Sequence, residues 1–236
     1  MSDQIAILLG ASGSVGQALL IEIVKQPSFK QVIVLCRTPL SPPPPFASKI
    51  VTRVVAEMTP ANLAQAVIAS LASCDLPVTA FSTLGIGAGT AKLSLEEHRA
   101  VDVALNGAFA SGLKTSGKVG HLIFMSAIGA NIMASTTGSG AAGMPRYARV
   151  KGEAEHAVLN QGPPLVSIFR PAVIIGSKHT PGYIAALLKA ISALLPYQYR
   201  AVKTTEIAQA MVALSIKPPQ ENSIYTYADM KARRHT

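Results

Sequence analysis

The sequence predicts an α/β fold, doubly wound, with a mostly parallel sheet and helices on both faces. Short, continuously apolar runs such as "IAILL" and "VIVLC" alternate with longer stretches of helical pattern. Strands that are apolar throughout are typical of a parallel sheet buried on both faces, and right-handed crossovers make such a sheet doubly wound. One domain over residues 1–236 is expected, in which residues 177–236 complete the sheet and form a small substrate-capping region around the pocket.

The expected elements follow one another in strand and helix order. Strands are expected over residues 5–9, 32–36, 50–55, 78–82, 121–126, 165–170 and 223–227. Helices are expected over residues 15–26, 183–195 and 204–215, and around Tyr147. Another helix is expected after Thr59, with Pro60 in its first turn. A long helix is expected to open at Ser94, where Glu97 completes a capping box.

Composition limits the class of protein and of partner. Apolar residues make up 49% of the chain and charged residues 14%, and the net charge is +9. Basic residues are scattered, aromatic residues are only 5%, and tryptophan is absent. A base-stacking surface is therefore poorly supplied, and a solvated basic surface is favoured over a nucleic-acid partner. The histidines show no metal-ligand spacing, so no metal site is expected.

The chain also shows no sign of membrane insertion or export. No apolar run reaches the ~18 residues of a membrane span, because Lys189 interrupts the longest one. The first residues, "MSDQIAILLG", lack a basic start and a long apolar core. Cys36 and Cys74 are the only cysteines, which indicates no disulfide framework. A cytoplasmic protein without a membrane span is expected.

The stretch "GASGSVG" joins the first strand to the first helix. Its glycines stand at positions 10, 13 and 16, and the helix is expected to begin on the last of them. A strand, a glycine turn and a helix in this order are typical of Rossmann-type folds, where the helix N-terminus attracts a dinucleotide pyrophosphate. The alternative is a merely structural turn. The expected cofactor-binding residues here are Gly10, Ser12, Gly13, Ser14, Val15 and Gly16.

The end of the second strand, "LCRTP", indicates which nicotinamide cofactor is preferred. An NAD-binding protein is expected to carry an acidic side chain here, on the ribose 2′-hydroxyl. Arg37 stands there instead, and a guanidinium grips a 2′-phosphate with two hydrogen bonds. We therefore predict NADP(H) over NAD(H), with Thr38 as a helper. The alternative is that Arg37 is an ordinary surface arginine.

Tyr147 and Lys151 in "PRYARVKGE" are four residues apart on an expected helix. That spacing places both side chains on one face. A Lys cation close to a phenol favours the phenolate, and a phenol with an ordinary pKa near ~10 needs this help to transfer protons at neutral pH. Alone, the spacing also arises by chance.

Taken together, the motifs resemble the short-chain dehydrogenase/reductase superfamily in its extended or atypical branch. The resemblance runs through "LLGASGSVG", "STLGIGAGT", "HLIFMSAIGA", "YARVKGEAE" and "FRPAVIIG", and is greatest with the TIP30-like group of small NAD(P)-binding proteins. It implies that Tyr147 is the general acid, that Lys151 binds the nicotinamide ribose and that Ser126 bonds to the substrate oxygen. It also implies cofactor contacts from Leu84 and Gly85, and from Pro171 to Val173.

Three features depart from that pattern. Ser126 and Tyr147 are separated by an extra Gly/Ser/Ala loop at residues 134–145, so Ser135 or Ser139 is an alternative to Ser126. The loop is expected to be either a mobile flap over the site or an insertion without function. Asn106 is only a candidate for a proton-relay asparagine. Glu153 and Glu155 are interpreted as part of a solvated helix face.

The sequence thus predicts an NADP(H)-dependent oxidoreductase that transfers hydride between nicotinamide and a small carbonyl or alcohol substrate. The alternative is an NADPH-binding regulatory or redox-sensing protein with little or no turnover. Residues 177–200, including Tyr183, Tyr197 and Tyr199, are expected to supply a partly apolar pocket. An oligomer is compatible with the sequence.

Overall fold

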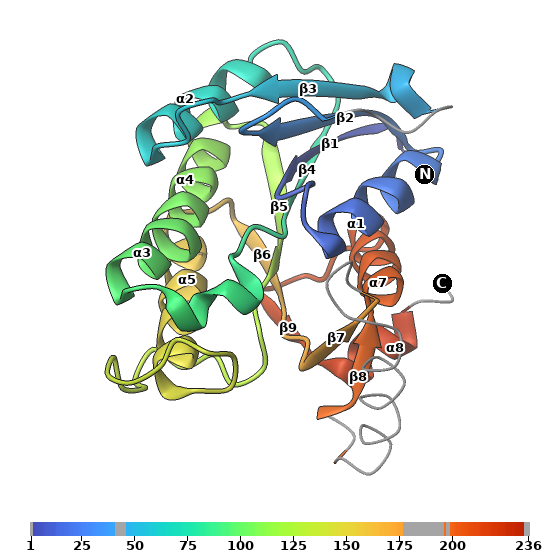
Figure 1. Ribbon diagram of the computed structural model, residues 1–236. Coiled ribbons are helices and arrows are strands. Elements are labelled where there is room, and N and C mark those ends of the chain that lie inside the picture. Colours follow the sequence, from blue (N-terminus) through green and yellow to red (C-terminus); the bar gives the residue numbers. More distant parts are fainter. Residues whose placement is uncertain (1, 41–45, 177–195, 197–198, 234–236) are drawn as a thin grey trace.

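The computed structural model describes residues 2–40, 46–176, 196 and 199–233 (Figure 1). Its centre is a seven-stranded parallel sheet in the order β3-β2-β1-β4-β5-β6-β9. The strands are β1 (Gln4–Leu9), β2 (Phe29–Cys36), β3 (Ile50–Val54), β4 (Val78–Ser82), β5 (Val119–Met125), β6 (Leu165–Phe169) and β9 (Ser223–Tyr225). The predicted doubly wound α/β fold is confirmed.

Helices cover both faces of this sheet (Figure 1). On one side lie α1 (Ser14–Lys25) and α7 (Thr204–Ile216), and on the other lie α2 (Pro60–Leu71), α4 (Asn106–Ser116) and α5 (Pro145–Gln161). Because successive side chains of a strand point to opposite faces, β1 feeds both cores. Ala6 and Leu8 pack with α1 and α7, whereas Ile5, Ile7 and Leu9 pack with the other three helices.

The segment between β4 and α4 differs from the expected single helix. Ser94 forms the predicted capping box with Glu97 at the start of α3 (Leu95–Arg99). A π-helix, η3 (Ala100–Leu105), then separates α3 from α4. Two short 3-10 helices, η1 (Phe46–Lys49) and η2 (Gly87–Lys92), precede β3 and α3 respectively. Thr59 caps α2 as predicted, since its side chain accepts a hydrogen bond from the Asn62 N–H.

Other boundaries also differ from the prediction: β2 begins at Phe29 and β5 at Val119, each earlier than expected. Helix α1 begins at Ser14, so Gly16 lies within its first turn rather than at its start. The expected last strand ends at Tyr225, and Tyr227 begins a short helix, α8 (Tyr227–Arg233). Strands β7 (Val173–Ile175) and β8 (Ala201–Lys203) form a separate parallel pair that the sequence pattern did not predict. The helix expected over 183–195 lies outside the described residues.

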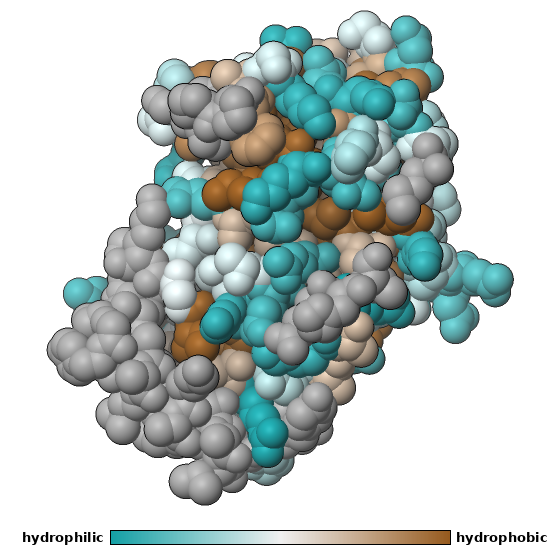
Figure 2. All heavy atoms as spheres, turned by 90° about the vertical axis from the view of Figure 1, so that its right-hand side faces the viewer, coloured by the Kyte–Doolittle hydropathy of each residue, from teal (hydrophilic) through white to brown (hydrophobic). Residues whose placement is uncertain are grey.

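The surface, the cysteines and the possible metal ligands show whether the described residues carry membrane, disulfide or metal features. Figure 2 shows the face that carries α1, α7 and α8, where apolar residues form separate small patches among hydrophilic ones outside the grey atoms. Within the described part of the chain, no helix is both long and apolar enough to cross a bilayer. Cys36 and Cys74 are both buried and free. In the same residues, no group of three or more His, Cys, Asp or Glu is arranged to hold a metal ion.

A buried histidine in β5 makes stability depend on pH. His121 is 6% exposed and lies 2.9 Å from the Ser167 hydroxyl, measured from Nε2. Burial lowers its pKa from 6.5 to about 4. Because the unfolded imidazole binds its proton at a higher pH than the folded one, this contribution to stability is complete above about pH 6.5 and is lost as the pH falls toward 4.

We therefore expect the change His121→Gln to flatten the pH dependence of the unfolding free energy between these limits. Between about pH 6.5 and 4, the unfolding free energy of the parent protein should fall by about 3 kcal/mol more than that of the variant, at 1.36 kcal/mol per pKa unit. Urea unfolding at a series of pH values measures it. The matched control is His156→Gln, in which the histidine removed is exposed on α5. Equal slopes in the parent protein and His121→Gln would contradict the assignment.

Candidate active site

The candidate site lies at the carboxyl edge of the sheet, where the strand order reverses between β1 and β4. Ligands of open parallel sheets bind at such a switch point. The glycine loop follows β1, and the segment from Thr83 to Ile86 follows β4. The two loops touch, since the Thr83 hydroxyl donates to the Gly10 carbonyl at 3.2 Å.

Two of the three loop glycines are required by close packing. Gly10 has a φ of +89°, and a Cβ there would lie 2.6 Å from the Leu84 nitrogen. A Cβ on Gly16 would lie 2.0 Å from the Gly10 carbonyl oxygen. Gly13 is different, because its nearest neighbour would be 3.5 Å away. Packing therefore explains Gly10 and Gly16, whereas the open side of Gly13 is what a ligand approaching the backbone requires.

The N-terminus of α1 fits an anionic group. Gly13 is the N-cap residue, no side chain caps the helix, and its first turn carries no acidic residue. The first N–H groups of a helix have no intrahelical acceptor, so they are free to bind a phosphate. Ser12 is exposed and Ser14 half-buried, whereas the Val15 side chain is buried in the core with α7. Val15 can therefore contribute only its backbone.

Arg37 stands at the same edge of the sheet, directly after β2. Both Arg37 and Thr38 are exposed. Strand β2 is separated from β4 by β1 alone. The glycine loop thus lies between Arg37 and the residues that follow β4. The adenosine end of an extended dinucleotide would lie on the Arg37 side of that loop.

Tyr147 and Lys151 are brought together on α5. The Lys151 Nζ lies 5.6 Å from the centre of the Tyr147 ring. Lys151 is only 5% exposed, while Tyr147 is half-buried. A Cβ on Gly85 would lie 3.1 Å from the same Nζ, so the loop after β4 passes directly over the amine. The predicted residues Gly85, Tyr147 and Lys151 therefore form one cluster.

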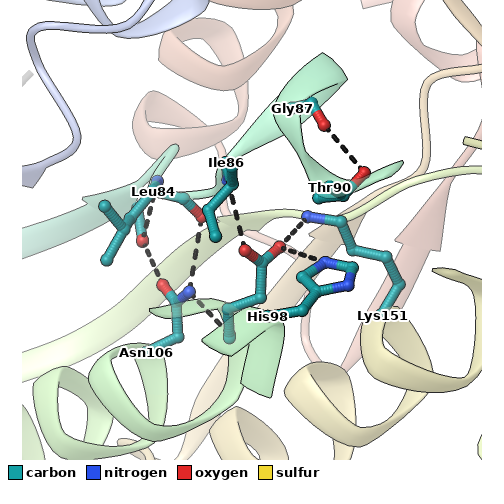
Figure 3. A network of polar contacts seen from close by, with 9 residues as sticks. Leu84, Ile86, Gly87, Thr90, His98, Asn106 and Lys151 are labelled. Carbon is teal, nitrogen blue, oxygen red and sulfur yellow. Dashed lines mark hydrogen bonds and ion pairs between the residues drawn. The ribbon is translucent and has the colours of Figure 1, made fainter. Parts of the chain in front are cut away.

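Asp102 belongs to this cluster, and the sequence reasoning missed it. Its Oδ1 accepts a hydrogen bond from Lys151 Nζ at 2.5 Å, and its Oδ2 accepts one from the Ile86 N–H at 3.2 Å (Figure 3). Burial opposes ionisation of both groups, but their mutual attraction outweighs it. The pKa of Asp102 is therefore below its ordinary value and that of Lys151 above it. The one signal in the sequence is an acidic residue within the apolar run "AVDVAL".

His98 adds a buried imidazole to the same cluster. It is fully buried, its ring lies 5.8 Å from that of Tyr147, and its Nε2 is 3.8 Å from Asp102 Oδ1. Neither ring nitrogen has a hydrogen-bond partner among the described residues. No role was predicted for this histidine.

Asn106 takes part in a buried network that holds the end of β4. Its Oδ1 accepts from the Ser82 hydroxyl at 2.6 Å, and its Nδ2 donates to the carbonyl oxygens of Leu84 and Asp102 at 3.3 and 2.8 Å (Figure 3). These contacts fix the start of the loop after β4 to η3. The side chain of Asn106 thus bonds to β4 and η3, while the Lys151 amine bonds to Asp102.

Ser126 directly follows β5 and is 4% exposed. Its hydroxyl has no hydrogen-bond partner within the described part of the chain. By contrast, Ser135 and Ser139 are exposed and engaged in local turns of the loop at residues 134–145. A buried hydroxyl without a partner is the feature expected of a group that bonds to a ligand.

The segment after Ser126 is fastened to α5 and to the segment after β6. The Asn131 N–H donates to the Ala148 carbonyl at 2.9 Å, and a Cβ on Gly152 would lie 2.3 Å from the Ile132 nitrogen. The Ile128 N–H donates to the Pro171 carbonyl at 2.9 Å. Pro171 is buried and Val173, at the start of β7, is half-buried. These contacts hold the loops after β5 and β6 against the helix that carries Tyr147.

The interpretation of Glu153 and Glu155 as a solvated face was wrong. Glu155 is 5% exposed and forms two hydrogen bonds with Arg170, at 2.8 and 2.5 Å. Glu153 is held between Arg99 and Arg149 at 2.6 to 2.7 Å. Arg99 comes from the end of α3, Arg149 from α5 itself and Arg170 from the end of β6, and helical spacing alone reveals only the Arg149 contact.

Many solved structures share the fold of this chain. No protein-family model matches the chain, and no curated protein sequence matches it either. Among solved structures, MoeE5 in complex with UDP-glucose and NAD has a TM-score of 0.65 at 13% identity, covering 97% of this chain and 80% of that one. The Bordetella bronchiseptica enzyme WbmG in complex with NAD has a TM-score of 0.66 at 15% identity, covering 96% and 73%.

A third similar structure is a short chain dehydrogenase from Burkholderia cenocepacia J2315 in complex with NADP. Its TM-score is 0.63 at 15% identity, and the match covers 98% of this chain and 91% of that one. The same architecture is therefore found in proteins that hold NAD and in one that holds NADP. At this level of identity the comparisons establish the Rossmann-type fold of the chain.

Proposed function

We propose that the protein is an NADP(H)-dependent oxidoreductase of the short-chain dehydrogenase/reductase type, acting on a small carbonyl or alcohol substrate. The observation that carries this proposal is the Tyr147–Lys151 pair, with a buried amine 5.6 Å from the phenol ring, at the same edge as an uncapped glycine-loop helix. The finer likeness to the TIP30-like group rests on the sequence motifs alone.

The residues divide the chemistry between them. A bound nicotinamide supplies or accepts the hydride. Tyr147 donates a proton to the oxygen of a carbonyl substrate, or accepts one from an alcohol, as a general acid or base. The Lys151 ammonium stabilises the phenolate and donates to the ribose hydroxyls of the cofactor. The Ser126 hydroxyl, which lacks another partner among the described residues, donates to the same substrate oxygen.

The binding residues proposed for the cofactor follow the sequence prediction. The N-terminus of α1 and the open side of Gly13 support phosphate binding at the glycine loop. The exposed Arg37 supports a preference for NADP(H) over NAD(H). Leu84 and Gly85 would pass beside the cofactor, and Pro171 and Val173 would line the nicotinamide pocket.

A second candidate function is an NADPH-binding regulatory or redox-sensing protein with little turnover. Asn106 favours it, because the side chain that would belong to a proton relay is occupied by Ser82, Leu84 and Asp102. Both candidates require the same cofactor site, so turnover separates them.

Removing the phenolic hydroxyl tests the catalytic assignment. In Tyr147→Phe we expect kcat to fall by about a hundredfold to ten-thousandfold, the usual contribution of general acid–base catalysis, while NADPH binds with unchanged affinity. The assay follows NADPH absorbance with a panel of aldehydes, ketones and quinones. UDP-sugars join the panel because MoeE5 holds one.

The matched control is Tyr225→Phe, which removes a phenolic hydroxyl from a ring stacked on Phe169 in the core. It should leave kcat unchanged. NADPH binding without turnover of any panel member would favour the sensor. A protein that binds neither pyridine nucleotide would sink both candidates.

Removing the guanidinium tests the cofactor preference. Hydrogen bonds to a charged group contribute about 1.5–3 kcal/mol, so Arg37→Ala should weaken NADPH binding by about ten- to a hundredfold. NADH has no 2′-phosphate, and its affinity should stay the same. Calorimetric titration of each reduced cofactor measures both constants.

Lys30→Ala is the control for the loss of one positive charge. Lys30 lies near the other end of β2, where it is exposed and paired with Asp3 at 3.1 Å. It should change neither affinity. Equal binding of NADPH and NADH to the parent protein would show that Arg37 does not select the cofactor.

A further inference from the structure

The π-helix η3 gives three buried polar residues a common direction. His98, Asp102 and Asn106 follow one another at intervals of four residues, and all are at most 1% exposed. Along an α-helix such a series drifts around the axis, because a turn takes 3.6 residues. The wider π turn, with its i→i+5 hydrogen bonds, counteracts that drift. With η3 inserted between α3 and α4, Asp102 and Asn106 both bond to the loop after β4, at the Ile86 N–H and the Leu84 carbonyl, and His98 lies 3.8 Å from Asp102.

Asp102 is the member of this series that connects the other parts. One carboxylate oxygen accepts from Lys151 Nζ at 2.5 Å and the other from the Ile86 N–H at 3.2 Å. The first contact reaches α5, and the second fixes the loop that follows β4. A carboxylate that is 1% exposed is costly unless it is paired, and here it is paired on both oxygens.

We infer that Asp102 is a positioning residue of the proposed oxidoreductase site, anchoring the Lys151 amine and the loop after β4 to each other so that the amine faces Tyr147. The catalytic part of this inference rests on the proposed function. The anchoring itself does not, and it can be measured without turnover.

The groups around Lys151 explain why Asp102 is needed. From α5 itself come Tyr147, whose ring is 5.6 Å from Nζ, and Glu155, which is bound by Arg170. From α3 comes His98, which faces Tyr147 and Asp102. Asp102 is thus the carboxylate in hydrogen-bond contact with the amine, and without it a buried ammonium would be favoured far less over the neutral amine.

One hydrogen bond to Asp102 still leaves the ammonium with donors for chemistry. A Lys ammonium has three N–H groups, and Asp102 takes one. The remaining two are available for the Tyr147 oxygen and for a ribose hydroxyl. The carboxylate therefore sets the charge and direction of the amine without saturating it.

Gly85 supports the same inference from the other side. A Cβ at this position would lie 3.1 Å from Lys151 Nζ and 3.2 Å from Asp102 Oδ1. Its φ is not positive, so the backbone conformation does not require glycine. A side chain at residue 85 would therefore crowd the ion pair, and glycine leaves both charged groups undisturbed.

The experiment follows the titration of Lys151 directly in the whole chain. Protein carrying ¹³C- and ¹⁵N-labelled lysine is titrated by NMR, and the Lys151 signal is assigned by its loss in Lys151→Arg. In Asp102→Asn, which keeps the size of the side chain and removes its charge, the Lys151 midpoint should fall by at least about one pH unit. An unchanged midpoint would overturn the inference.

Glu153→Gln is the matched control, because it removes one negative charge from α5 two residues beyond Lys151. Glu153 is bound by Arg99 and Arg149, so the Lys151 midpoint should not move. If Asp102→Asn does not fold, the Lys151 midpoint of the parent protein is the readout. Pairing with Asp102 should hold it above the ordinary lysine value of ~10.4, and a midpoint below that value would overturn the inference.

Kinetics adds a readout that a purely structural role would not move. In Asp102→Asn, Lys151 should lose its proton at a lower pH than in the parent protein. The alkaline decline of kcat/KM should therefore move to lower pH by the same interval as the NMR midpoint. The KM for NADPH should rise as well. A shifted Lys151 in a chain without turnover upholds the role of Asp102 and counts against the proposed function alone. Turnover with an unshifted Lys151 overturns the role of Asp102 and leaves the proposed function standing.

Discussion

The ion pair between Lys151 and Asp102 is the interaction on which the candidate site depends. Both groups are almost completely buried, and each is costly to bury without the other. Their contact joins α5 to η3, and the second oxygen of Asp102 extends the link to the loop after β4. Three segments that are distant in sequence are thereby held in one arrangement. Removing either partner would leave an uncompensated buried charge, which is strongly destabilising, so each group depends on the other.

Glycines allow the loops to approach this pair closely. Gly10 and Gly16 let the first loop pack on itself and on the loop after β4, and Gly85 lets that second loop pass over the ion pair. Gly152 does the same for the segment after β5, which rests on the backbone of α5. Each of these glycines has a different neighbour. At Gly10, Gly16 and Gly152 the backbone of one segment meets the backbone of another, and at Gly85 the loop meets the charged ends of Lys151 and Asp102.

The sequence predicted those features whose causes are local. All seven central strands were predicted at their places in the chain, and the cap residues Thr59 and Ser94 were recognised because their partners lie three residues away. The Tyr147–Lys151 contact was predicted for the same reason. Strands β7 and β8 were missed because they have three residues each, too few to form a pattern.

Features that depend on distant residues were missed or wrongly interpreted. Asp102 and Lys151 are 49 positions apart, and nothing in either neighbourhood indicates the other. Glu155 has a helical pattern typical of a solvated face, yet Arg170 reaches it from the end of β6. The π-helix is equally hidden, because its residues have ordinary helical propensity. The Asp102 pair, the Glu155 pair and the π-helix all involve residues that meet only in the folded chain, so the sequence around each of them does not indicate it.

The two ends of the candidate site differ in their electrostatics, and this difference follows from the ion pair. At the glycine loop, an uncapped helix N-terminus without acidic neighbours and the exposed Arg37 together favour an anion. At Tyr147, the positive charge of Lys151 is balanced by Asp102, so the cluster has little net charge to attract a phosphate. The electric field at the phenol then comes from the dipole of the Lys151–Asp102 pair, because the net charge of the pair is close to zero. In the proposed function, phosphate binding and proton transfer would therefore take place at different points along the edge of the sheet, and that separation would orient a bound dinucleotide.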